Sequence, residues 1–185
     1  MHDGISLRAT DDWGVTMGAK PTGHYLLKAD GLYLQFDRLF RAPIEDVWFS
    51  LTNPGFLERW IGTYTGLPST GAVRFKMTAE DPDAPWMNVS ILECEAPHRF
   101  SLDIGEMPDS MRLSAHLLEA GGMTTLSFAH RLHDAKQAVE YGPGWDYYLD
   151  RLDAAREDRP LPDWEAYASA FDRHYKELHV PDAVS

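Results

Sequence analysis

The alternation of apolar and polar residues predicts a β-hairpin as the first ordered element. An Asp-Gly pair at residues 30–31 separates two apolar segments, and this pair in this position is a strong hairpin signal. The pattern predicts a strand at residues 24–29 paired with a strand at 32–41. Period-two alternation along the second strand places Arg38 on the same face as large apolar residues. Arg38 is therefore a lone charge on an apolar surface.

The period then changes to that of a helix. Pro43 suits a first helical turn because its missing N–H costs no bond there, and the acidic residues that follow it complement a helix N-terminus. Asn53-Pro54 ends this helix, and the segment FLERWIG supplies a second one that ends at Gly62. Two short helices are expected between the hairpin and the next strands.

The rest of the chain predicts strands first and helices last. Turn residues separate five strand-like segments, at 72–79, 86–95, 98–104, 110–118 and 123–132. Asp134 is a candidate cap for a long helix, which either kinks at Gly142-Pro143-Gly144 or begins afresh there. Asp163 opens a last helix whose aromatic stripe, Trp164, Tyr167, Phe171 and Tyr175, is interpreted as its buried side. Segregated strands and helices indicate the α+β class, with the long helix covering one face of an antiparallel sheet.

Length, composition and charge indicate the number of domains, the cellular compartment and the classes of partner to expect. The length of 185 residues and the absence of an interdomain linker indicate one domain at 23–180, preceded by an irregular lead-in at 1–22. The N-terminus lacks the pattern of a secretory or transit signal and no apolar run is long enough to span a bilayer, so a cytoplasmic, membrane-free protein is expected. A formal net charge of −12 disfavours binding to nucleic acid. The one cysteine, Cys94, is interpreted as a packing residue, and a homodimer stays possible.

Motif searches give no nucleotide or metal site. The chain contains neither a phosphate-binding G-x-x-x-x-G-K nor a G-x-G-x-x-G pattern, and it has no G-x-S-x-G nucleophile motif. His130 and His133 fall on opposite strand faces, without a third ligand nearby. No cofactor and no metal are expected.

Candidate ligand-binding residues come from the apolar strand faces and the inner side of the long helix. Trp60 is expected near the mouth, and Glu93 is the expected partner of Arg38, since an unpaired buried guanidinium is costly. His130 is either a hydrogen-bonded core residue or a proton-transfer group. The full predicted set is Phe36, Arg38, Phe40, Trp60, Glu93, Leu113, Leu126, Phe128, His130, Tyr141, Trp145, Tyr148 and Leu149. Such a set fits both a small-molecule cavity and a filled core.

Four ordered blocks carry a resemblance to a known family. These are FDRLFRAPIEDVWFSLTNPGFLERWIG, ILECEAPHRF, GGMTTLSFAHRL and YGPGWDYYLDRL. From about Gly23 to Leu178 the chain resembles the AHSA1-like (activator of Hsp90 ATPase homologue 1-like) branch of the START/SRPBCC superfamily. The resemblance implies a helix-grip fold, in which a curved sheet wraps around the helix at 143–158 and the two short helices close one end of a cavity.

Function does not follow from such a fold alone, because it resides in the chemistry of the site. The leading hypothesis is binding of a small apolar or aromatic molecule in the cavity, with Arg38, and His130 or Tyr141 beside it, fixing a polar group of the ligand. The enzyme alternative is a cyclase- or hydrolase-like activity with His130 or Glu93 as general base and Arg38 stabilising negative charge. A chaperone-regulating interaction module, implied only by the family name, is the third hypothesis.

Overall fold

The computed structural model describes residues 20–106, 108–168 and 171–181, and confirms the α+β architecture. Its eight-stranded sheet is antiparallel throughout, in the order β1-β2-β8-β7-β6-β5-β4-β3. The strands are β1 (His24–Lys28), β2 (Gly31–Phe40), β3 (Thr63–Thr65), β4 (Ala72–Lys76), β5 (Met87–Glu95), β6 (Arg99–Ile104), β7 (Met111–Ala120) and β8 (Met123–Leu132). The expected lead-in at 1–22 lies outside the described residues except for its last three.

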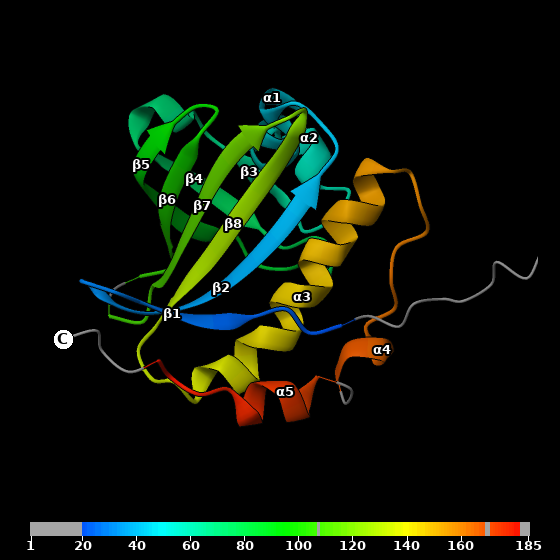
Figure 1. Ribbon diagram of the computed structural model, residues 1–185. Helices are drawn as coiled ribbons and strands as arrows, with labels where there is room; N and C mark the ends of the chain where they lie inside the picture. Colours follow the sequence, from blue (N-terminus) through cyan, green and yellow to red (C-terminus); the bar gives the residue numbers. More distant parts are fainter. Residues whose placement is uncertain (1–19, 107, 169–170, 182–185) are drawn as a thin grey trace, which may run out of the picture.

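The helices are grouped as the sequence pattern predicts. They are α1 (Ile44–Thr52), α2 (Pro54–Leu57), α3 (Gln137–Arg156), α4 (Glu165–Ala168) and α5 (Asp172–Glu177), with a short 3₁₀ turn, η1 (Pro68–Thr70). Figure 1 shows α3 lying across the concave face of the curved sheet, with α1 and α2 near its C-terminal end and α5 near its N-terminal end. None of the described helices has the length and apolarity that crossing a membrane requires.

Three details differ from the sequence-based expectation. Strand β3 was not predicted, because three residues are too few to show a period. The long helix begins at Gln137 with Lys136 instead of Asp134 at its N-cap, and it continues through Pro143 without a fresh start. The last helix is divided into α4 and α5, although the buried side of the aromatic stripe is confirmed for Tyr167, Phe171 and Tyr175, each no more than 2% exposed. Trp164 is 44% exposed.

Gly142 explains how α5 approaches α3 closely. A Cβ atom built on Gly142 would lie 2.4 Å from the Tyr175 ring, whereas one on Gly144 would meet nothing within 4 Å. The absent side chain of Gly142 thus creates the space in which Tyr175 packs. This contact fixes the C-terminal segment on the N-terminal half of α3.

Candidate functional site

Five aromatic side chains from β8 and α3 form what we call the inner aromatic cluster: Phe128, His130, Tyr141, Trp145 and Tyr148. The centroid of the Trp145 ring lies 4.6 Å from that of Phe128, and the His130 and Tyr141 centroids are also 4.6 Å apart. Period-two alternation on β8 and helical spacing on α3 bring these residues together, as the sequence pattern predicts. The structure confirms that all five lie between the sheet and α3.

His130 is held in a defined orientation within this cluster. Its side chain is 3% exposed, and the indole Nε1–H of Trp145 donates a hydrogen bond to its Nδ1 at 3.1 Å. Burial, with a smaller contribution from the charge of His133, lowers the pKa of His130 to about 4. The imidazole is therefore neutral at physiological pH.

Tyr148 connects the cluster to the loop between β4 and β5. Its hydroxyl donates a hydrogen bond to the carboxylate of Glu80. Burial and this carboxylate both raise the pKa of Tyr148. The bond ties the middle of α3 to a loop that carries further partly buried apolar residues, Met77 and Ala79.

The cover that α3 gives to the sheet is uneven. Directly paired residues of an antiparallel sheet present their side chains on the same face. We call the face of β8 that packs against α3 the inner face. The strand pairing shows which residues of β7, β6, β5, β4 and β3 lie on this same face. On β2 and β8 the apolar inward side chains at the centre of the sheet are buried. Several inward residues beyond them are only partly buried, and we call six of these the inner strip: Tyr64, Phe75, Phe100, Leu102, Ile104 and Met111.

The sequence pattern missed all six residues of the inner strip. Apart from Trp60 and Glu93, it placed the site on β2, β7, β8 and α3, the elements with the strongest apolar alternation. The alternation Phe100, Leu102, Ile104 is nevertheless present in the segment predicted as a strand at 98–104. Adding this face of β6 to the predicted lining would have identified half of the inner strip.

Arg38 lies on the inner face as predicted, but its partners come from α3. Its Nη2 lies 3.1 Å from a carboxylate oxygen of Asp146 and 3.1 Å from one of Asp150. Its Nη1 donates to the Thr22 hydroxyl at 2.6 Å, and Thr22 in turn donates through its backbone N–H and its hydroxyl to Asp146. Asp146 has no exposed surface. The expectation of a carboxylate partner for Arg38 is confirmed.

Two tyrosines of the C-terminal segment complete this ion-pair network. The Tyr175 hydroxyl donates to Asp146 and accepts from the backbone N–H of Gly23 at 3.2 Å. The Tyr167 hydroxyl donates to Asp150 at 2.8 Å. Burial raises the pKa of both tyrosines and of Asp150. The network of Thr22, Arg38, Asp146, Asp150, Tyr167 and Tyr175 joins the N-terminal segment, β2, α3 and the C-terminal helices.

The predicted pairing of Arg38 with Glu93 is wrong, for two reasons. Three strands separate β2 from β5 in the sheet order, and each step is about 4.8 Å. A β-bulge at Leu92 also inserts one extra residue, because Ile91 pairs with Leu102 and Glu93 with Ser101. The bulge turns Glu93 to the outer face, where it lies 2.7 Å from Arg99 and is about half exposed. Glu93 does not join the inner aromatic cluster.

The remaining predicted residues divide between core and surface. Trp60 is buried, and its indole N–H donates to the Ser50 carbonyl at 3.1 Å, so it is not an open mouth residue. Cys94 is exposed, which makes its interpretation as a packing residue wrong. Five predicted apolar residues are buried in the same core as the inner aromatic cluster: Phe36, Phe40, Leu113, Leu126 and Leu149.

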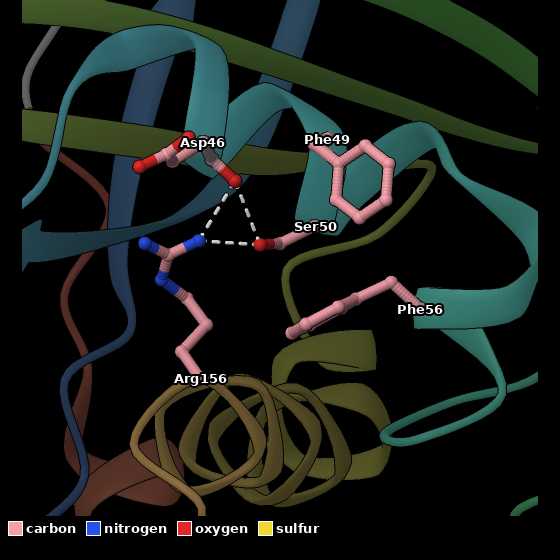
Figure 2. Close-up of a pocket in the computed structure, with 5 residues that line it drawn as sticks. All are labelled: Asp46, Phe49, Ser50, Phe56 and Arg156. Carbon is pink, nitrogen blue, oxygen red and sulfur yellow. Dashed lines mark hydrogen bonds between the residues drawn. The ribbon is translucent and has the colours of Figure 1, made fainter.

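A separate pocket of about 220 Å³ lies at the other end of α3, lined by Asp46, Phe49, Ser50, Phe56 and Arg156. Figure 2 shows the Arg156 guanidinium directed at Ser50 and Asp46 of α1, with the two phenylalanine rings beside them. The Arg156 Nη1 donates to the Asp46 carbonyl at 2.8 Å and to the Ser50 hydroxyl. Burial lowers the pKa of Arg156. These bonds fasten the end of α3 to α1, and the small, mixed-charge pocket is poorly suited to an apolar ligand.

Comparisons with solved structures support the fold. The chain is similar to CalU16 from Micromonospora echinospora, with a TM-score of 0.68, 22% identity, and coverage of 86% of this chain and 96% of that one. It is also similar to a protein from Bordetella parapertussis, with a TM-score of 0.66, 22% identity and coverage of 89% and 95%. A conserved protein of unknown function from Enterococcus faecalis matches with a TM-score of 0.60, 20% identity and coverage of 84% and 88%. These likenesses show a shared helix-grip fold.

The sequence comparisons give the family. No curated protein matches the chain. The family profile described as "Activator of Hsp90 ATPase homolog 1-like protein" matches residues 41–157, which is more than half of the chain. This match includes α1, α2 and the strands that carry the inner strip, and it ends just beyond α3. The chain therefore belongs to the AHSA1-like family of the START/SRPBCC superfamily.

Proposed function

We propose that this protein binds a small apolar or aromatic molecule against the inner strip, on the part of the concave face that α3 does not cover. The incomplete burial of the inner strip carries the proposal. Water-accessible apolar side chains that gather on one concave face are a favourable surface for an apolar ligand, because covering them removes apolar area from water.

The positions of His130, Glu93 and Arg38 favour ligand binding over catalysis. The enzyme alternative requires a general base, and the Nδ1 lone pair of His130 is already occupied by the Trp145 N–H. Glu93 lies on the outer face, and Arg38 is engaged by two carboxylates. The three candidate catalytic residues do not form a common site. We therefore favour binding without a chemical step.

The experiment uses N-phenyl-1-naphthylamine, a neutral aromatic probe whose fluorescence rises in apolar surroundings. Wild-type protein is expected to bind it saturably. Leu102→Glu places a charge on the inner strip, where an unpaired carboxylate is costly next to an apolar ligand, and should weaken probe binding at least about tenfold. Leu118 is 62% exposed, and its neighbour Leu117 is the buried residue at that point of β7, so Leu118→Glu is the matched control.

Equal probe affinities of the two variants would contradict the proposed location. Absence of probe binding to the wild type would contradict the proposed function. Native mass spectrometry of the full chain purified from its own host would then identify the physiological ligand by mass.

A further inference from the structure

The geometry points to a specific role for His130 that deepens the proposed function and rests on it. We infer that the Nε2–H of His130 donates the hydrogen bond that recognises an acceptor oxygen on the bound apolar molecule. The ligand class is thus an aromatic or alicyclic compound with a carbonyl or a similar uncharged oxygen. Ketones, quinones and esters belong to this class.

The first step is the position of the imidazole proton. An indole N–H can only donate, so the Nδ1 atom that accepts from Trp145 must present a lone pair. A neutral imidazole carries one proton, and that proton must then reside on Nε2. The Trp145 bond therefore selects the tautomer with Nε2 as donor.

The second step is the absence of a partner for this donor. Within residues 20–106, 108–168 and 171–181, the only hydrogen bond of the His130 side chain is the one from Trp145. Every fully buried side-chain nitrogen or oxygen of the described residues has a hydrogen-bond partner. The Nε2 atom is consequently not sealed off by protein, although the residue as a whole is 3% exposed. A nearly buried donor that lacks a partner is costly unless water or a ligand satisfies it.

The third step is the position of this donor relative to the inner strip. His130 pairs with Leu113 on β7, and Leu113 pairs with Leu102 on β6. His130 and Leu102 thus share the inner face, two strands apart, or about 10 Å. This separation matches the size of a two-ring molecule, whose apolar end would contact the inner strip while its oxygen reaches Nε2.

The fourth step excludes other polar ligands. A cationic amine needs an acceptor, and the acceptor atom of His130 is already used by Trp145. A neutral ring also gives no net charge to attract a carboxylate. At the Nε2 position itself, His130 therefore selects for an uncharged acceptor.

The test uses two probes with the same carbon skeleton, 1-tetralone and tetralin, which differ by one carbonyl oxygen. Wild-type protein is expected to bind 1-tetralone about two- to twelvefold more tightly than tetralin, the usual range for one net hydrogen bond. His130→Phe removes the donor and should abolish the preference. His130→Gln supplies an amide donor and should restore part of it. Glu93→Gln, on the outer face, is the control that keeps the full preference.

A ligand-free measurement tests the tautomer directly. Long-range ¹H–¹⁵N correlation spectra of the wild type, assigned by the signals lost in His130→Gln, should show a protonated Nε2 and an unprotonated Nδ1 between pH 6 and 8. A protonated Nδ1 would overturn the inference. Equal affinity for both probes would also overturn it, while leaving apolar binding intact. Failure of both probes to bind would instead count against the proposed function, and the spectra would still decide the tautomer.

Discussion

Two adjacent residues of α3, Trp145 and Asp146, belong to regions with opposite character. Asp146 sits in the ion-pair network, where Thr22, Arg38 and Tyr175 occupy its carboxylate oxygens. Trp145 sits in the inner aromatic cluster, where it leaves the Nε2 atom of His130 without a protein partner among the described residues. Both regions bury polar groups. What distinguishes a structural polar group from one available to a ligand is whether the protein already satisfies its hydrogen-bonding capacity.

The largest expected effect comes from a variant of the ion-pair network, the region in which the protein itself satisfies the buried polar groups. Asp146→Ala removes a fully buried carboxylate and leaves Arg38 and Tyr175 short of partners, so the free energy of unfolding should fall by about 3 kcal/mol. Urea unfolding followed by circular dichroism measures the loss. Asp172→Ala, in an exposed ion pair with Lys176, should cost less than about 1 kcal/mol. Equal losses in the two variants would show that the network is not a structural anchor.

The next effect is a dependence of the free energy of unfolding on pH, and it comes from His130, whose Nε2 atom has no protein partner among the described residues. The folded-state pKa of His130, about 4, lies below its unfolded value of about 6.5, so the unfolded chain binds the additional proton first as the pH falls. The contribution of His130 to the free energy of unfolding should be fully present above pH 6.5. It should decrease towards pH 4, by up to about 3 kcal/mol. Urea unfolding at several pH values measures the slope, which should be shallower in His130→Gln. The same slope in both proteins would contradict a buried neutral imidazole.

The smallest effect tests how α5 holds the network in place. Alanine in a helix is ordinarily more stable than glycine by about 1 kcal/mol. Gly144→Ala should show this gain, since a Cβ there meets nothing within 4 Å. Gly142→Ala should instead destabilise by about 2 kcal/mol, because the new methyl group collides with the Tyr175 ring. Thermal or urea unfolding compares the two, and a gain in both variants would show that Tyr175 moves aside without cost.

Local sequence patterns predicted most of the fold. The Asp-Gly hairpin, the Pro and Asn boundaries of α1 and α2, and the alternation of β6 to β8 are signals within short windows, and each matches an observed element. Strand β3 and the division between α4 and α5 have no comparable signal, because pieces of three to six residues are too short to show a period. The AHSA1-like assignment, which rests on longer blocks, is confirmed by the family match.

The site was predicted less completely, because it depends on long-range geometry. The lone charge of Arg38 correctly indicated a carboxylate partner, but the partners lie 108 and 112 positions away on α3. Their identity depends on how that helix is rotated over β2. Likewise, the pairing of His130 with Trp145 needs both a strand face and a helix face to be placed in three dimensions. Residue type identified the candidates, and packing decided their roles.

The bulge at Leu92 decides which face of the sheet receives the two carboxylates at the end of β5. Val89 and Ile91 face inward before it, and Glu93 faces outward after it. If Leu92 took a regular place in the ladder, strict alternation would direct the carboxylates of Glu93 and Glu95 at the concave face. Deleting Leu92 would instead remove the bulge and leave Glu93 opposite Ser101, still facing outward. Related chains should therefore tolerate the loss of this residue better than the loss of the bulge with the residue retained.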